Sequence, residues 1–198
     1  MAKPRIVVFG GSARRASYSK QLARACVAPL EAAGGVVEWL DLADFPAPLY
    51  HGDLEHEAGL PATIVDLQQR LAASDGLLVV SPEYNGSVTP LLKNTLDWCS
   101  RPNPTDKARS GVAVFGGRAA AVMASSPGPL GGIRVLFHVR DILGYLGMLV
   151  IPQQLAVGKA AEVIGADGRL TDEKQQGALE SVCRSLVDAA RSLRGTAG

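Results

Sequence analysis

Residues 76–100, GLLVVSPEYNGSVTPLLKNTLDWCS, combine a short apolar run, a polar turn and the start of a helical pattern. The run over residues 77–80 has no polar alternation, which is typical of a strand covered on both faces of a parallel sheet. A polar turn with Pro and Gly occupies residues 81–87, and apolar positions then recur at helical spacing over residues 91–98. Ligands in open α/β sheets bind beyond the carboxyl ends of the strands, so the turn is where a ligand is expected.

Four other short runs have the composition of strands, and helical patterns separate them. The strand candidates are residues 5–9, 36–40, 119–124 and 148–151. A competing run at residues 112–115 is less favoured, because residues 119–124 end directly in a polar, Gly/Pro-rich loop. One amphipathic helix is expected around residues 22–30, and residues 41–60 are expected to form a loop with little periodicity. The alternation predicts an α/β fold with a five-stranded parallel sheet and helices on both faces, although periodicity does not order the strands.

Length and charge restrict the classes of protein that fit. The 198 residues, 47% of them hydrophobic, predict one domain over residues 1–198. Twenty Lys and Arg against 19 Asp and Glu leave a net charge of +1, which provides no electrostatic attraction to nucleic acid or an anionic membrane. No apolar run approaches the roughly 20 residues of a membrane span, and the first residues resemble a strand more than a signal peptide. We therefore expect a cytoplasmic protein with neither of those partners.

The cysteines and histidines do not form a metal-binding pattern. Cys26, Cys99 and Cys183 are far apart and lack CxxC spacing, so we interpret them as small buried residues without chemistry. His51 and His56 lie among acidic residues, but their spacing matches no metal-ligand pattern, and we predict no metal site.

Hydroxyl groups and arginines gather directly after the first strand. This loop contains Ser12, Arg14, Arg15, Ser17 and Ser19, and a helical pattern follows it. Free backbone N–H groups and the helix dipole favour phosphate at such a helix start, and Arg14 or Arg15 can add a charge-assisted contact. The alternative is that Ser17 only caps the helix and the arginines are solvated.

A third polar loop begins at Ser125 and includes Gly128. In a parallel sheet, the loops after the first, third and fourth strands all open on one edge, which favours the ligand-binding interpretation of the first loop. The helix expected after Gly131 and Gly132 contains His138, which we interpret as a packing or surface residue.

Three segments in this order resemble the NADPH-dependent FMN reductase family of flavodoxin-like proteins. They are GSARRASYS at residues 11–19, SPEYNGSVTPLLKNTLDW at 81–98 and SSPGPLGGIR at 125–134. They look like the family's GSxRxxSxN phosphate loop, its P-E-Y-N flavin loop and its S-x-G-x-x-G-G loop. The resemblance implies a flavodoxin-like three-layer sandwich with FMN as cofactor and NADPH or NADH as hydride donor.

The resemblance also implies positions for the parts of FMN. The phosphate is expected among Ser12, Arg14, Ser17 and Ser19, where Ser19 replaces the family's Asn and reaches less far. The ribityl chain and isoalloxazine are expected against Pro82, Glu83, Tyr84, Asn85 and Gly86, with Ser125 and Gly128 on the other side. Because the flavin performs the chemistry, no side chain is expected to be catalytic.

Two of these residues have competing interpretations. We interpret Glu83 as a carboxylate that fixes the loop and not as an acid. Tyr84 either borders the flavin or packs at a subunit interface.

The resemblance implies that hydride passes from the nicotinamide to flavin N5 and then, in a ping-pong reaction, to a small-molecule acceptor. Free FMN, a quinone, an azo dye or an oxidised metal species remain open as acceptors. A flavodoxin-type electron carrier and a cofactor-free interaction module are the alternatives, and the near-neutral charge argues against the carrier.

The resemblance further implies a homodimer or homotetramer. The helix at residues 91–99 carries Leu92, Leu96, Trp98 and Cys99, more apolar groups than one core-facing stripe requires, and Trp98 is interpreted as a core or interface residue.

Overall fold

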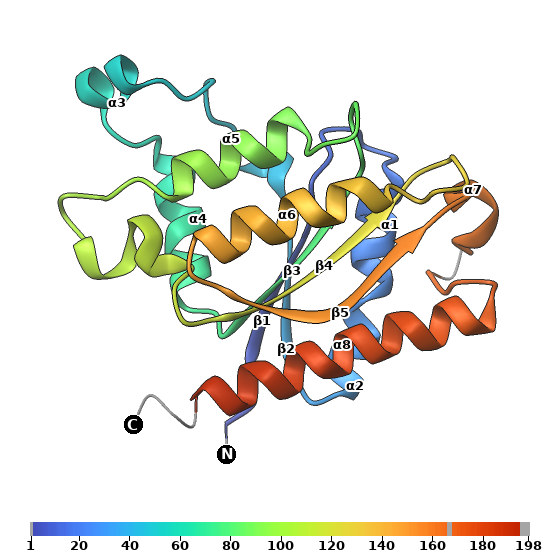
Figure 1. Cartoon of the computed structure of the whole chain (residues 1–198). Coiled ribbons are helices and arrows are strands. Elements are labelled where there is room, and N and C mark those ends of the chain that lie inside the picture. The colour runs from blue at the N-terminus through green and yellow to red at the C-terminus, as the bar shows by residue number, and fades with distance from the viewer. Residues whose placement is uncertain (1, 166–167, 195–198) are drawn as a thin grey trace.

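The computed structural model describes residues 2–165 and 168–194, which form a parallel five-stranded sheet with helices on both faces (Figure 1). The strands are β1 (Arg5–Gly10), β2 (Val36–Asp41), β3 (Gly76–Ser81), β4 (Ala119–Ser125) and β5 (Leu149–Val157). Their order, β2-β1-β3-β4-β5, is that of flavodoxin-like folds. The predicted fold class is confirmed, as is the preference for the strand at residues 119–124.

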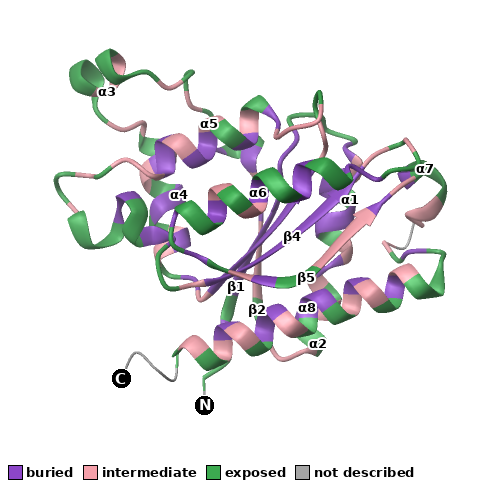
Figure 2. Cartoon of the chain, in the orientation of Figure 1, coloured by how far each residue is buried: buried purple, intermediate pink, exposed green. Residues whose placement is uncertain are grey.

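The central strands supply two separate cores, because successive side chains of a strand point to opposite faces. On β3, Leu77 and Val79 belong to one core, and Leu78 and Val80 belong to the other. Every residue of β3 and β4 is buried, which explains the absence of polar alternation in the sequence (Figure 2). Burial of each such Leu or Val side chain stabilises the fold by roughly 1.5–3 kcal/mol.

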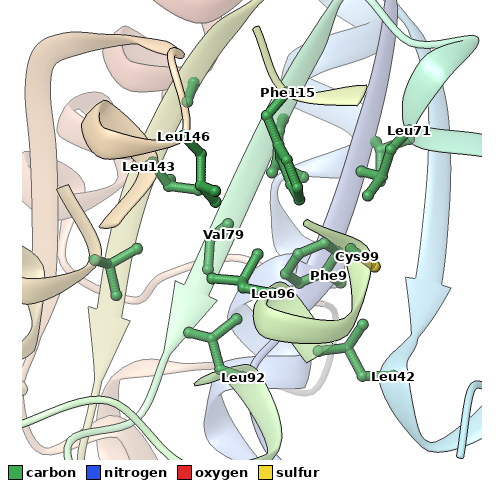
Figure 3. Close-up of a cluster of buried hydrophobic side chains, with 14 of the residues drawn as sticks. Phe9, Leu42, Leu71, Val79, Leu92, Leu96, Cys99, Phe115, Leu143 and Leu146 are labelled. Carbon is green, nitrogen blue, oxygen red and sulfur yellow. The ribbon is translucent and has the colours of Figure 1, made fainter. Parts of the chain in front are cut away.

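Helices α4 (Ala62–Ala72), α5 (Pro90–Cys99) and α6 (Ile133–Tyr145) cover one face of the sheet. Figure 3 shows Phe9 and Val79 of the sheet close to Leu96 of α5. Helices α1 (Tyr18–Ala25), α2 (Val27–Ala32) and α8 (Glu173–Arg194) cover the opposite face. The remaining short helices are η1 (Leu42–Asp44), α3 (Gly52–Ala58), η2 (Lys107–Arg109), η3 (Gly111–Val114) and α7 (Ala160–Val163).

The single helix expected around residues 22–30 is in fact two helices, α1 and α2, which meet at Cys26. Pro29 explains the break, since it has no N–H to donate to the carbonyl of Ala25 and its ring crowds that carbonyl. The two helices still pack along the same side of the sheet.

The last strand is longer than the sequence indicates. It continues through Pro152 and two glutamines to Val157, and its pairing with β4 shifts register between Ala120 and Val122. Because β5 is an edge strand, it can contain a proline, and Pro152 and Gln153 are exposed while Gln154 is half-buried.

Residues 41–60 were expected to be a loop, but they contain η1 and α3. The imidazole of His51 accepts a hydrogen bond from the Leu54 N–H at 3.2 Å and caps α3. The segment is held against α5 by Asn94, which bonds to Tyr50 and Pro48, and by Trp98 Nε1, which donates to the Pro48 carbonyl at 2.8 Å.

The apolar side chains of α5 pack within the core of this chain. Leu92, Leu96, Trp98 and Cys99 are all buried, because the sheet lies on one side of α5 and residues 48–50 lie on another. Trp98 is thus a core residue, and the excess of apolar groups on α5 provides no argument for an oligomer.

The three cysteines are buried and free, as expected. Burial raises the pKa of the Cys99 thiol, and contact with Cys183 together with burial raises the pKa of Cys26. Thiols held protonated in this way are poor nucleophiles. Within residues 2–165 and 168–194, no helix combines the length and apolar character needed to cross a membrane.

Candidate functional site

Three loops at the carboxyl ends of β1, β3 and β4 line one pocket of about 230 Å³. Eight of the eleven predicted site residues line it, namely Ser12, Arg14, Ser17, Ser19, Pro82, Glu83, Tyr84 and Ser125. Tyr18, Ser126 and Pro127 line it as well. The structure thus brings together three segments, the first and last of which are more than a hundred residues apart in the sequence.

The first loop is anchored to its neighbours at Gly11. The Gly11 N–H donates to the Val80 carbonyl at 2.8 Å, and the Thr89 hydroxyl donates to the Gly11 carbonyl. At Gly10, an added Cβ would lie 2.9 Å from the backbone nitrogen of Lys20, so only glycine lets α1 approach the end of β1 this closely.

The start of α1 offers hydrogen-bond donors that the protein itself does not use. The described part of the chain provides no acceptor for the backbone N–H groups of Tyr18, Ser19 and Lys20. The Ser17 hydroxyl does not cap the helix, because it pairs with the Ser19 hydroxyl at 2.8 Å. With the positive end of the helix dipole, these groups form a suitable cradle for an anion.

Two cations lie close to this cradle, and their surroundings differ. Lys20 Nζ is 2.7 Å from Asp41 Oδ1 and is almost fully buried, so its charge is already neutralised within the fold. The Arg14 guanidinium lies 5.8 Å from the Tyr18 ring centroid and donates to the Ala16 carbonyl at 2.9 Å, and it has no carboxylate partner among the residues that the structure describes. Arg14 is therefore the cation that lines the pocket and remains available to an anionic ligand.

The second loop is a tight hairpin. The N–H of Tyr84 donates to the Ser87 carbonyl, and the N–H of Ser87 donates to the Tyr84 carbonyl, both at 3.0 Å. Asn85 and Gly86 make the turn with φ of 51° and 79°, the left-handed conformation that two-residue hairpins favour. They consequently form the tip of the hairpin and do not line the pocket.

Glu83 joins the second loop to α6. Its Oε2 accepts from the N–H groups of Arg134 at 2.9 Å and Val135 at 3.3 Å, and its Oε1 lies 3.3 Å from Arg134 Nη1. The N-cap of α6 is Gly132, which has no side chain to satisfy these donors, so Glu83 caps the helix from outside. The carboxylate fixes the loop, as interpreted from the sequence.

The third loop contributes a buried hydroxyl without a partner. Ser125 is 1% exposed, and its Oγ finds no hydrogen-bond partner within the described residues. Gly128 does not line the pocket, and its carbonyl instead accepts from the Lys159 N–H at 3.1 Å and the Ser126 hydroxyl at 3.2 Å. Gly128 therefore holds the shape of the loop.

Other candidate sites are less suited to a cofactor. A larger cavity of about 640 Å³ lies between the α1–α2 pair and α8, on helix surfaces away from the loops at the strand ends. In the part of the chain that the structure describes, no group of three His, Cys, Asp or Glu residues is placed to bind a metal ion.

Comparison with known proteins identifies the family. A family model described as NADPH-dependent FMN reductase matches residues 4–162. The chain belongs to the NADPH-dependent FMN reductase family. It is 34% identical over 170 residues to a 2-hydroxy-1,4-benzoquinone reductase from Burkholderia sp, covering 85% of this chain and 86% of the other. It is 31% identical over 196 residues to an NAD(P)H-dependent FMN reductase from Pseudomonas aeruginosa, covering 96% and 97%.

A solved structure agrees with this assignment. The flavoenzyme NAD(P)H:(acceptor) oxidoreductase FerB from Paracoccus denitrificans superposes with a TM-score of 0.79 at 28% identity, covering 96% of this chain and 98% of that chain. The protein is therefore an NAD(P)H-dependent oxidoreductase with FMN as its cofactor.

The pocket of this FMN reductase is suited to FMN, because it contains hydrogen-bond donors that have no partner among the described residues. The unused N–H groups of α1 suit a phosphate, and the buried Ser125 hydroxyl lacks the partner that buried polar groups normally have. Tyr18, Ser126 and Pro127 also line the pocket, although they were not among the predicted site residues. Each is directly adjacent in the sequence to a predicted site residue, so they could have been predicted from their position in the same loops.

Proposed function

We propose that the reductase holds the FMN phosphate with Ser12, Arg14, Ser17 and Ser19. The single observation that carries this proposal is the set of unpaired donors gathered in one pocket. The N–H groups at the start of α1 have no partner within the described residues, and neither has Ser125 Oγ at the other end of the site. Buried polar groups left unpaired in this way cost free energy until a ligand satisfies them.

The remaining predicted residues form the wall for the flavin ring. In this proposal Pro82, Glu83 and Tyr84 line one side of the ring and Ser125 lines the other, while Asn85, Gly86 and Gly128 shape the loops that carry them. Glu83 is occupied by the α6 N–H groups and is not free to act as an acid or base. The chain's own residues bind and orient, and no side chain is assigned a catalytic role.

Bound FMN supplies the redox chemistry, taking hydride from NAD(P)H and passing electrons to an acceptor. We propose a ping-pong order, in which donor and acceptor use the open side of the same pocket one after the other. The acceptor we favour is a quinone or free flavin. The name of the Burkholderia relative, a benzoquinone reductase, supports a flat aromatic acceptor.

Two kinetic measurements test this order. Initial rates at several fixed quinone concentrations should give parallel double-reciprocal lines against NADPH, and stopped-flow mixing with NADPH alone should reduce the bound flavin fully. Intersecting lines would contradict the ping-pong order. A protein that binds FMN but is not reduced by NADPH would instead be an electron carrier of the flavodoxin type.

We also propose that the reductase forms a homodimer or homotetramer through the outer face of α6. Ile133 and Phe137 are one turn apart on this helix and are 45% and 58% exposed, and Tyr145, about two turns beyond Phe137, is 91% exposed. Sedimentation velocity should find a dimer or tetramer that Phe137→Asp dissociates. A wild-type monomer at micromolar concentration would contradict the assembly.

A further inference from the structure

His138 lies outside the pocket, yet it contacts the hairpin that forms part of the pocket wall. Its Nδ1 is 2.8 Å from the hydroxyl oxygen of Ser87, the last residue of the hairpin. His138 is four residues after Arg134, so it lies one helical turn further along the same side of α6. Helix α6 therefore holds the hairpin at both ends, by Glu83 at the first residue and by Ser87 at the last.

Tyr84 lies between the two attached residues, Glu83 and Ser87, and it lines the pocket. Within the described residues its backbone hydrogen bonds are the two 3.0 Å bonds to Ser87, and its side chain is 47% exposed at the rim. At Gly86 the nearest neighbour of an added Cβ would be Arg134 Cδ at 3.9 Å, so the space beside this residue of the turn is not tightly packed. The position of Tyr84 thus depends on how firmly Ser87 is held.

We propose that His138 is a positioning residue that holds the hairpin as a rigid rim and thereby fixes Tyr84 at the open side of the pocket. This inference rests on the proposed function, because Tyr84 then limits the width available to the nicotinamide and to the acceptor. His138 does not line the pocket, so it acts through Ser87 and Tyr84 and not on a bound molecule.

Hydrogen exchange tests the attachment whether or not the protein turns over NADPH. His138→Ala and Ser87→Ala should each speed exchange of the hairpin amides at Tyr84 and Ser87 by about three- to tenfold, as expected for loss of one hydrogen bond. The same amides should exchange more slowly in His138→Asn than in His138→Ala, because the Asn side chain keeps a polar atom near the position of Nδ1. His56→Ala, which removes an exposed histidine from α3, is the matched control and should leave the hairpin unchanged. Unchanged exchange in His138→Ala would overturn the proposal.

Kinetics tests the consequence for the reaction. His138→Ala should raise KM for both NADPH and a benzoquinone several-fold while FMN affinity changes less than twofold, and His138→Asn should restore most of the loss. Equal defects in the Asn and Ala variants would show that ring volume matters and not the hydrogen bond. Faster exchange with unchanged KM would overturn the link to substrate binding. A wild-type protein without turnover would refute the proposed function and leave the exchange result to decide the attachment.

Discussion

Hydrogen bonds separate the polar side chains around the pocket into two kinds. Glu83 and Lys20 are satisfied by partners in the chain, the first by the start of α6 and the second by Asp41. Ser125 Oγ has no partner within the described residues, and Arg14 donates to a nearby carbonyl without a carboxylate. The first kind builds the site, and we infer that the second kind is directed at the ligand.

Arg14→Ala should weaken FMN binding by about 1.5–3 kcal/mol, the cost of losing a charge-assisted contact to the phosphate. Isothermal titration of the apoprotein with FMN measures the loss. Arg15→Ala is the matched control, since Arg15 is exposed and does not line the pocket. Unchanged affinity in the Arg14 variant would show that backbone N–H groups alone hold the phosphate.

Ser125→Ala should affect the stability of the ligand-free protein and its affinity for FMN in different ways. Removal of an unpaired buried hydroxyl should leave the ligand-free protein as stable as before or about 1 kcal/mol more stable, while FMN binds about fivefold more weakly. Urea unfolding with and without FMN gives both values. Ser74→Ala is the contrasting variant. Ser74 is also buried, but its hydroxyl donates to the Leu71 carbonyl at 2.7 Å, so its loss should destabilise the protein. Similar destabilisation by both variants would argue against a ligand-directed Ser125.

Residue types and their order were enough to predict most of the pocket, but not the partner of each side chain. The hydroxyls after β1 and the Pro-Glu-Tyr turn after β3 could be read directly, because strand ends in a parallel sheet share one edge. The attachment of Glu83 to Arg134 spans 51 residues, and that of Ser87 to His138 spans the same distance. No local pattern reports such contacts, so His138 was interpreted only as a packing or surface residue.

At the scale of elements, α6 carries the pocket wall although none of its own residues lines the pocket. Its first turn holds Glu83 and its second turn holds Ser87. A helix that begins at two glycines has no cap of its own, and the neighbouring loop provides one. Helix stability and loop position are therefore coupled.

Glu83→Ala should destabilise the protein by about 1–2 kcal/mol, because it removes the cap of α6 and the negative charge near its start. Glu83→Gln keeps an oxygen that accepts from the Arg134 N–H and should cost less. Chemical unfolding of the two variants without FMN measures the difference. If the alanine variant is as stable as wild type, the capping role is wrong.

The contacts that hold helix α3 (Gly52–Ala58) should contribute less to the stability of the protein at low pH. Burial raises the pKa of the Glu55 carboxyl, but hydrogen bonds from Arg101 and Tyr50 outweigh it, so the pKa lies below its ordinary value of 4.5. A carboxyl with a lowered pKa stabilises the fold fully above its ordinary pKa, and this contribution disappears as pH falls through the lowered value.

The difference in melting temperature between wild type and Glu55→Gln should therefore be present at pH 7 and shrink well below pH 4.5. Glu57→Gln, an exposed change on the same helix, should show no such difference. A wild-type advantage over Glu55→Gln that persists in strong acid would contradict the assignment.

Element boundaries were less predictable than element types. Periodicity found each strand and the main helices, yet Pro29 divides the first helix and Pro152 hides the second half of β5. Helix α3 was missed because none of its residues is buried, so it has no apolar stripe to detect. Its place is determined by Asn94 and Trp98 on α5, which are distant in sequence.

At the scale of the whole molecule, the strand order β2-β1-β3-β4-β5 explains why three separated loops form one pocket. Strand β3 is central and pairs with β1 on one side and β4 on the other, so the loops that follow these three strands are adjacent. The near-zero net charge offers no attraction to a large charged partner and agrees with a small-molecule acceptor.

We propose that the pocket at the ends of β1, β3 and β4 binds FMN and presents it to NAD(P)H. A visible absorption spectrum of the purified protein under argon, recorded before and after addition of NADPH, tests it most directly. We expect a yellow protein whose flavin bands bleach when NADPH is added and return when a quinone follows. A colourless protein that takes up no FMN, or a yellow one that NADPH leaves unchanged, would contradict it.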